Sequence, residues 1–304
     1  MIKFIVVRVL QAIPAWIGMT MVVFALMQFL GDPTVVMLPP DASEANRAAF
    51  RAAYGLDQPF YVQYWRFLLH VAQGDFGKSI SYHEPAAQVF FSRLPATAQL
   101  SAAAMILATI IAIPAGIIAA VKRNSIYSYL SMGFVLLGQS IATFWLGMML
   151  ILIFAVNLRI FPVSGYGTPM HLVLPTITLA AWLLGLLARM TRSELLEVLG
   201  HDYVRTARAK GLTEPVVVAK HALKNVLIPI VTLIGLQFAH LFGGAIMTEV
   251  VFAWPGIGTL VMDAIFKRDY PLVLVSVSMV ATIFIAVNLV VDLLYSYIDP
   301  RIRY

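Results

Sequence analysis

The run "ATAQLSAAAMILATIIAIPAGIIAAV", residues 96–121, decides the class of this protein, because it contains no Asp, Glu, Lys or Arg. A helix of roughly 20 apolar residues crosses the hydrocarbon core of a bilayer, so this run predicts a transmembrane helix. The rest of the chain has the same character, since 61% of its 304 residues are hydrophobic and 12% are charged. The composition therefore predicts a polytopic membrane protein.

Six segments are long and apolar enough to span a membrane as helices. They cover about residues 9–30, 96–121, 130–156, 171–191, 226–249 and 272–297. The first follows Lys3 and Arg8, as a signal peptide would, but it is too long and ends in "MQFLGDP" without a small-x-small cleavage site. We interpret it as a retained anchor. The expected fold is all-α, with six transmembrane helices and both termini on one side.

Positive charge predicts which side of the membrane each segment occupies. The 21 Lys and Arg residues lie beside apolar runs instead of in one block, which indicates contact with membrane lipid and argues against nucleic acid as a partner. With the N-terminus in the cytoplasm, the short outer loops hold only Arg159, Lys267 and Arg268. Because basic residues favour the cytoplasmic side, we expect both termini there (N-in, C-in).

Residues 31–95 form a predicted external insertion, which we expect to be soluble. "DASE", residues 41–44, resembles a capping box that opens a helix ending near Gly55, and Pro59 can begin a second helix. The apolar residues of this second helix share one face: Phe60, Tyr64, Phe67, Leu68 and Val71. We interpret that aromatic face as a packing surface, with a ligand-binding surface as the alternative.

The sequence offers no familiar catalytic or metal site. It has no Cys and no H-E-x-x-H pattern, and its six His residues are scattered. "PVSG", residues 162–165, departs from the G-x-S-G of an intramembrane serine protease at its first position, so a hydrolase is the least favoured hypothesis. We expect no catalytic residue, no bound metal and no cofactor on this chain.

Ion-coupled carriers place ionisable groups at mid-membrane, and the apolar segments hold few of these. Glu249 and Asp292 fall toward the ends of the fifth and sixth segments, and only His240 is deep. Each can instead cap a helix or form an interhelical hydrogen bond. The chain also lacks G-x-x-x-x-G-K-[ST], so any ATPase must be a separate subunit. A self-contained secondary transporter or channel stays open as the alternative.

One polar segment interrupts the apolar pattern: "DYVRTARAKGLTEPVVVAKHALKN", residues 202–225. Asp202 can cap a short helix over Tyr203–Lys210, and Gly211 suits the left-handed position that ends a helix. Pro215 fits the first turn of a following helix. The segment therefore predicts a helix, a sharp turn and a second helix on the cytoplasmic side.

The two sides of this short helix differ in chemistry. One side carries Tyr203, Thr206, Ala207 and Lys210. Arg205 and Arg208 lie three residues apart on another side. Small residues allow a close fit to a partner and cations can pair with its acidic groups, whereas the alternative is that the cations reach toward anionic lipid.

These residues carry a resemblance to a known family. "DYVRTARAKGL" followed by "HALKNVLIPIV" resembles the cytoplasmic coupling motif of permeases of ATP-binding-cassette (ABC) importers, in the dipeptide, oligopeptide and nickel branch. Four further stretches resemble the same branch in the right order: "YGLDQPFYVQYWRFL", "GDFGKS", "EVVFAWPGIGTLVMDAI" and "DLLYSYIDPRIR". Many importers outside this branch have Glu at the position of Arg205. The Arg at this position is consistent with the dipeptide, oligopeptide and nickel branch.

The resemblance implies a type I ABC importer permease in a bacterial inner membrane. Residues 1–95 would form the first span with its insertion, and 96–304 the five-helix core. The implied partners are a second homologous permease in a heterodimer, two cytoplasmic subunits that bind ATP and Mg, and an external substrate-binding protein. Dipeptides, oligopeptides, glutathione-like compounds and nickel complexes are the implied cargoes. The residues expected to couple to the ATPase are Tyr203, Arg205, Thr206, Ala207, Arg208, Lys210, Gly211 and Leu212.

Small and polar residues at helical spacing suggest a translocation path in two segments. In the third segment these are Gln139, Thr143 and Gly147. In the fifth they are Gln237, His240, Gly244 and Thr248. Helix packing through small residues is an equal alternative in both.

The outer segment "FAWPGIG", residues 252–258, joins an aromatic residue to helix-breaking residues. In the resembling family this region lies near the external mouth, which suggests Trp254, Pro255 and Gly256 as a gate. The alternative is an interfacial turn in which Trp254 is one of the aromatic residues that mark the membrane surface.

Overall fold

The computed structural model describes residues 2–29, 34, 38–39, 41–55 and 57–298. Within these residues the regular structure is helical, apart from an isolated antiparallel bridge between Lys78 and Pro85. The chain forms two compact units, one of Met1–Thr97 with Pro255–Ala286 and the other of Ala98–Trp254 with Val287–Tyr304. The division of the sequence at residue 95 stays a prediction, since the first unit also takes in a later segment.

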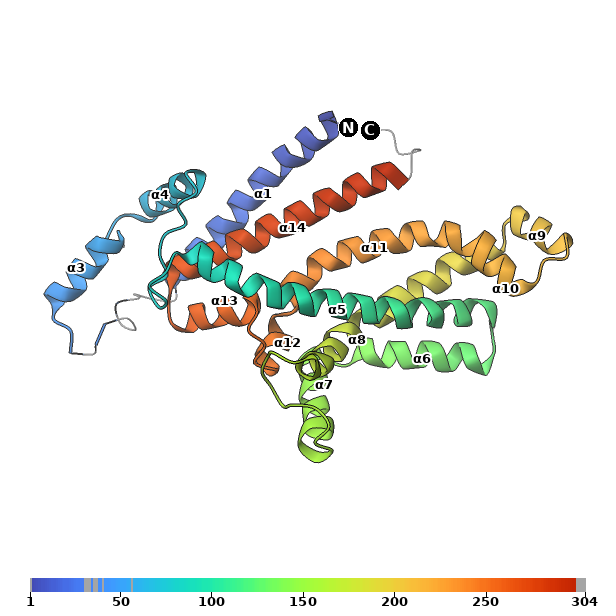
Figure 1. Cartoon of the computed structure of the whole chain (residues 1–304). Coiled ribbons are helices and arrows are strands. Elements are labelled where there is room, and N and C mark those ends of the chain that lie inside the picture. The colour runs from blue at the N-terminus through green and yellow to red at the C-terminus, as the bar shows by residue number, and fades with distance from the viewer. Residues whose placement is uncertain (1, 30–33, 35–37, 40, 56, 299–304) are drawn as a thin grey trace. The chain divides into compact units, whose positions relative to one another are not determined.

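The first unit contains α1 (Ile2–Phe29), α3 (Glu44–Tyr54), α4 (Phe60–Ala72), α13 (Ile257–Phe266) and the first parts of α5 (Ala86–Val121) and α14 (Tyr270–Ile298). Its core joins the beginning of α5 to α13 and α14 through Phe90, Leu260 and Leu272, which are at most 2% exposed. α1 runs beside α14 (Figure 1), and the indole Nε1 of Trp16 donates to the Ser278 carbonyl at 3.2 Å.

The insertion contains both predicted helices, with one change at the first cap. The N-cap of α3 is Ser43, whose Oγ accepts from the Asn46 amide at 3.2 Å, so the expected capping role of "DASE" beginning at residue 41 is wrong. The helix ends as predicted at Gly55, which has a positive φ of 66°. α4 begins after Pro59 and packs its aromatic face on α1, where Phe24 contacts Tyr64 with ring centroids 5.5 Å apart. The packing interpretation of that face is confirmed.

The second unit is built around α8 (Pro169–Leu199), the most deeply buried of the long apolar helices. Around it lie the rest of α5, α6 (Ile126–Ser140), α7 (Thr143–Leu150), the π-helix η1 (Ile151–Asn157), α11 (Leu223–Gly244) and α12 (Ile246–Val251). Small residues let these helices approach closely, because a Cβ added at Gly116 would lie only 2.6 Å from the Cβ of Thr191 on α8.

The predicted apolar segments all fall on helices, but not all as straight spans. Four helical stretches within the described residues are long and apolar enough to cross a membrane: Ala86–Val121, Pro169–Leu199, Glu214–Gly243 and Tyr270–Val291. The first predicted span lies in α1, whose described apolar part is Leu10–Leu26. The count of six spans and the N-in, C-in orientation stay predictions.

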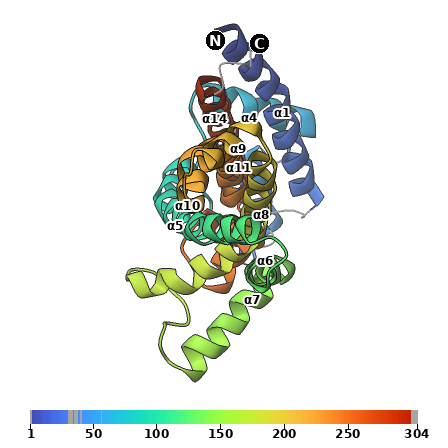
Figure 2. The same ribbon diagram turned by 90° about the vertical axis from the view of Figure 1, so that its right-hand side faces the viewer.

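The third predicted span is not one continuous helix. α6 and the α7–η1 segment meet at an angle of 102°, and Figures 1 and 2 show α7 turning away from α6. Ile141 and Ala142 at the junction have ψ of 132° and 129°, so their extended backbone interrupts the helix. The expectation of a single helix over 130–156 is therefore wrong.

Candidate functional site

The polar segment at residues 202–225 forms the predicted helix, turn and helix at the end of α8. α9 (Asp202–Ala209) begins after His201, so Asp202 lies in the first turn and is not the cap. Its carboxylate is still favourable there, because the N-terminus of a helix carries partial positive charge. Gly211 has a φ of 80°, and its amide donates to the Arg208 carbonyl at 2.9 Å. The left-handed turn predicted at Gly211 is confirmed.

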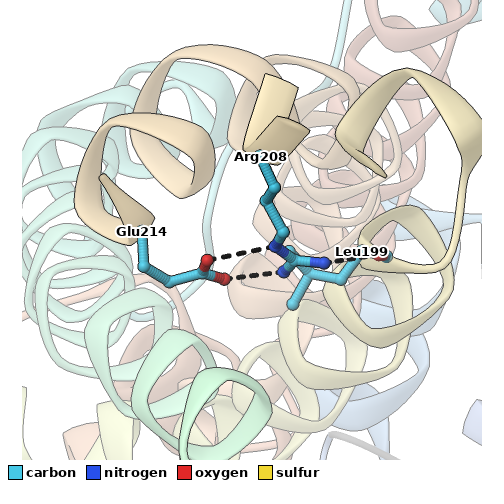
Figure 3. A network of polar contacts seen from close by, with 3 residues as sticks. All are labelled: Leu199, Arg208 and Glu214. Atoms are coloured by element: carbon cyan, nitrogen blue, oxygen red, sulfur yellow. Dashed lines mark hydrogen bonds and ion pairs between the residues drawn. The ribbon is translucent and has the colours of Figure 1, made fainter. Parts of the chain in front are cut away.

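Arg208 fastens this turn to the helices on both sides of it (Figure 3). Its Nη2 and Nε donate to the two carboxylate oxygens of Glu214, on α10 (Glu214–Val216), at 2.7 and 3.1 Å. Its Nη1 donates to the Leu199 carbonyl at the end of α8, at 3.5 Å. Hydrogen bonding to Arg208 lowers the pKa of the Glu214 carboxyl group below its ordinary value, although burial acts in the opposite direction.

This bidentate pair changes the interpretation of the basic side of α9. The sequence suggested that Arg205 and Arg208 meet acidic groups of a partner, but Arg208 is engaged by Glu214 within its own chain. A bidentate Arg–carboxylate pair fixes geometry as well as charge. The sequence could have predicted this ion pair, because Arg208 and Glu214 stand on either side of the expected turn at Gly211.

The inner side of α9 is apolar and belongs to the core of its own unit. Val204 is fully buried and Ala207 is 5% exposed, in a cluster with Leu195, Val217 and Val226. The expectation that Ala207 lies on a partner-facing side is therefore wrong. Two positions three apart on a short helix are enough to anchor it, and here they are Val204 and Ala207.

The outward side of α9 and its turn carries most of the other predicted coupling residues. Tyr203 is 40% exposed, and its hydroxyl accepts from Asn225 Nδ2 on α11 at 2.6 Å. Arg205 Nη1 lies 3.6 Å from Asp202 Oδ1. Both side chains are largely exposed, so this ion pair contributes little to the stability of α9. The remaining exposed coupling residues are Thr206, Lys210, Gly211 and Leu212.

The structure does not bring the third-segment path residues onto one face. Gln139 is in α6 and Thr143 in α7, on opposite sides of the 102° bend. Gln139 packs against Gly185 of α8, where any Cβ would collide with the Gln139 side chain. Gly147 is buried and lies close to Phe252. The shared face predicted for these residues is wrong, and the contacts are those of helix packing.

The fifth-segment residues are also divided. Gln237 and His240 are both in α11, but Gln237 is 7% exposed while His240 is exposed. α11 ends at Gly244, and Thr248 belongs to the separate helix α12. Thr248 is fully buried, and its Oγ1 has no hydrogen-bond partner within the described part of the chain. A continuous polar stripe over these four residues is therefore wrong.

Trp254 lies in a packed turn and not at a lipid surface. It is 1% exposed, and its ring meets that of Tyr166 edge to face with centroids 4.8 Å apart. Its amide donates to the Glu249 carbonyl at 2.8 Å, which closes the turn after α12. The alternative of a membrane-surface aromatic is therefore wrong. Pro255 and Gly256 precede α13 in the other compact unit, where Thr259 Oγ1 donates to the Gly256 carbonyl at 2.9 Å.

Sequence analysis missed Asp269, which is fully buried before α14. Its Oδ2 accepts from Ser79 Oγ at 2.6 Å and from the Ser81 amide at 2.9 Å. Its Oδ1 accepts from the Leu272 amide at 3.2 Å, so Asp269 also caps the helix. The signal was available, because an Asp before a helix with Pro271 in its first turn is a typical start.

Metal binding is not indicated in the described part of the chain. No group of three or more His, Asp or Glu side chains there could hold an ion. The ionisable residues singled out above lie in separate places: Asp269 before α14, His240 on α11 and Glu214 on α10.

Comparison with known proteins matches the sequence to one family. Residues 112–304 match the family described as "Binding-protein-dependent transport system inner membrane component", and residues 1–101 match its N-terminal family. The chain is 42% identical to the dipeptide transport system permease protein DppB of Escherichia coli K12, over 100% of this chain and 99% of that one. It is 43% identical to the glutathione transport system permease protein GsiC of Salmonella paratyphi A, over the full length of both.

Solved structures show the same fold at lower identity. A chain of the inward-facing MetNI methionine ABC transporter aligns with a TM-score of 0.60 and 18% identity, covering 71% of this chain and 99% of that one. An amino acid ABC transporter aligns with a TM-score of 0.53 and 14% identity, covering 71% of this chain and 95% of that one. The chain therefore belongs to the family of binding-protein-dependent transport system inner membrane components, as a permease subunit of an ABC importer.

Proposed function

We propose that this permease carries short peptides or peptide-like compounds inward, as half of a heterodimeric path. The support is its similarity over the whole chain to permeases named for dipeptide and glutathione transport. The partners in this proposal are a second permease, two cytoplasmic subunits that bind and hydrolyse ATP with Mg, and an external substrate-binding protein that meets the insertion. Nickel complexes remain a cargo to be tested.

The coupling proposal concerns α9, which we place in a groove of the cytoplasmic ATPase. The observation that carries it is the way α9 is held. Val204 and Ala207 anchor its inner side, while Arg208 joins the end of α8 to Glu214 beyond the turn. Tyr203 is hydrogen-bonded to Asn225 on α11. A short helix held at several points transmits a displacement to α8 and α11 instead of bending.

Contact with the ATPase would use the outward side. Arg205, Thr206 and Lys210 are exposed there, and Leu212 adds an exposed apolar side chain after the turn. Cations at the rim of an interface orient a partner and a central apolar contact stabilises it. Ala207 supports the helix from within and does not touch the partner in this arrangement.

Gln237 and His240 remain the proposed path residues of α11, and Trp254 with its neighbours the proposed gate region. His240 is exposed in this chain, so it can face an aqueous path once a second permease is present. Trp254 would act as a fixed support for the gate, since its side chain is buried against Tyr166.

A steric substitution tests the docking without altering charge. Thr206→Trp adds bulk to the exposed side of α9, whereas Ala219→Trp places the same side chain at an exposed position of η2 (Val217–Ala222). Thr206→Trp should release the ATPase during purification and reduce substrate-stimulated ATP hydrolysis, while Ala219→Trp should retain both. Lipid contact alone predicts no difference, because all cations survive in both variants. Normal transport with a bound ATPase in Thr206→Trp would refute the docking proposal.

A further inference from the structure

α4 has a composition that a soluble insertion does not need. Its residues divide into three sectors around the helix, at 3.6 residues per turn. The first packs on the protein through Phe60, Tyr64, Phe67 and Leu68, and Val71 lies on the same side of the helix. The second is apolar and exposed, with Tyr61, Trp65 and Leu69 at 71%, 61% and 43% exposure. The third is polar, with Gln63, Arg66 and His70 followed by the C-cap residue Gln73.

The first sector places α4 beside the apolar part of α1. The Tyr64 hydroxyl donates to the Ile17 carbonyl at 2.9 Å and lies 3.0 Å from Thr20 Oγ1. Ile17 and Thr20 fall in the middle of the apolar stretch Leu10–Leu26. Figures 1 and 2 both draw α4 next to α1.

With the N-terminus in the cytoplasm, as predicted, these contacts extend toward the outer end of α1. Phe24, near the end of that apolar stretch, packs with Tyr64 and with Leu274, which lies in the first turns of α14. Tyr64 and Thr20 are 6% and 1% exposed, and each hydroxyl group has a backbone carbonyl of α1 within hydrogen-bonding distance. Polar groups satisfied in this way by the protein are what a water-free environment requires.

From this geometry we propose that α4 lies in the outer interface of the membrane, with Tyr61, Trp65 and Leu69 in contact with lipid. α1 also exposes apolar side chains, since Val22 and Leu26 are 59% and 56% exposed on its side away from α4. Tyr and Trp are the residues that favour the boundary between headgroups and acyl chains. Arg66 and His70 then face water and phosphate, as the polar face of an interfacial helix does.

This placement differs from the expectation that the insertion is soluble, which stays a prediction. In this proposal α4 belongs to the surface that contacts lipid, and the rest of the insertion lies outside the membrane. It is independent of the cargo and of the coupling proposal, because only α1, α4 and α14 carry it.

Collision measurements on a spin label can test the placement, since the chain has no native Cys. Trp65→Cys and His70→Cys are labelled separately in the transporter assembled with its partner subunits in lipid bilayers. Oxygen, which concentrates in hydrocarbon, and a water-soluble nickel chelate are the two probes. Ile110→Cys, at a 65% exposed position of α5, is the lipid reference, and Ala48→Cys, exposed on α3, is the water reference.

Position 65 should behave like position 110, with the ratio of oxygen to nickel collisions several-fold higher than at position 70. Position 70 should behave like position 48. Nickel access at position 65 equal to that at position 48 would mean that α4 is surrounded by water. Protection of position 65 from both probes would mean that a protein partner covers it. Either result overturns the proposal, and Leu69→Cys provides an independent second reading on the same sector.

Discussion

The buried carboxylate of Asp269 holds the loop at residues 79–81 to the beginning of α14, so its removal should open that loop. Asp269→Ala removes the acceptor for Ser79 Oγ, the Ser81 amide and the Leu272 amide. A hydrogen bond to a charged group contributes about 1.5–3 kcal/mol, and loss of an N-cap costs about 1 kcal/mol. Water entering the opened loop recovers part of this, which leaves a net loss of about 3 kcal/mol.

The loss of stability can be measured as the rate at which a thiol reagent labels a buried Cys next to this carboxylate. Ile80 is 7% exposed, and Ile80→Cys introduces a thiol into the Cys-free chain. A polar thiol reagent added from outside should modify Cys at position 80 only when the loop opens. Since about 1.4 kcal/mol corresponds to a tenfold change in an equilibrium, Asp269→Ala should accelerate labelling by about 100-fold over the Ile80→Cys parent.

Two comparisons separate this carboxylate from general loosening of the protein. Asp263→Ala removes an exposed acid from α13 and should leave the labelling rate unchanged. Ser79→Ala deletes one partner of Asp269 and should produce a smaller acceleration than Asp269→Ala. If Asp269→Ala labels within about threefold of its parent, equivalent to less than 1 kcal/mol, the carboxylate does not hold the loop and the reasoning fails.

Three further outcomes are expected. Gly211→Val should cost about 1–2 kcal/mol through backbone strain at positive φ and lower coupled ATP hydrolysis. Gly211→Asn should retain more coupled ATP hydrolysis than Gly211→Val, because Asn adopts a positive φ more readily. Equal ATP hydrolysis in the two variants would show that the positive φ of residue 211 is not important for coupling. Gly185→Leu should lower the melting temperature of the purified protein, because overpacking costs about 1–3 kcal/mol. Gly133→Leu should not lower it, because there is open space around the Cβ position of residue 133. Equal shifts in melting temperature would contradict the close approach of α6 to α8. A reporter at position 60 should be external and one at position 209 cytoplasmic, and finding both on one side would end the topology prediction.

Local signals predicted well what local physics determines. The apolar length of residues 96–121 and the left-handed turn at Gly211 depend on a few neighbouring residues, and both were predictable. The division of residues 130–156 was not, because no Gly or Pro stands at Ser140–Thr143 where the helix breaks. Both α6 and α7 pack on α8, a contact that local sequence spacing does not reveal.

Side-chain direction was the weakest part of the prediction, for the same reason. A short helix such as α9 has small or apolar residues on more than one side, so sequence spacing left two possible inner faces. Val217 and Val226, distant in sequence, select the face of Val204 and Ala207. Trp254 likewise becomes buried through Tyr166 from a loop that precedes α8.

The structure also explains why so polar a segment persists between apolar helices. Val204 and Ala207 pack in the buried core of their own unit. Arg208 forms an ion pair with Glu214 of the same chain. On α9 and the turn after it, the other exposed basic side chains are Lys210 and Arg205, the latter only weakly paired with Asp202. If α9 served only to hold its own loop, these two cations would be dispensable. A partner with acidic groups beside an apolar contact for Leu212 would use both, which is why Thr206, at the centre of that outward side, is the position where added bulk discriminates best.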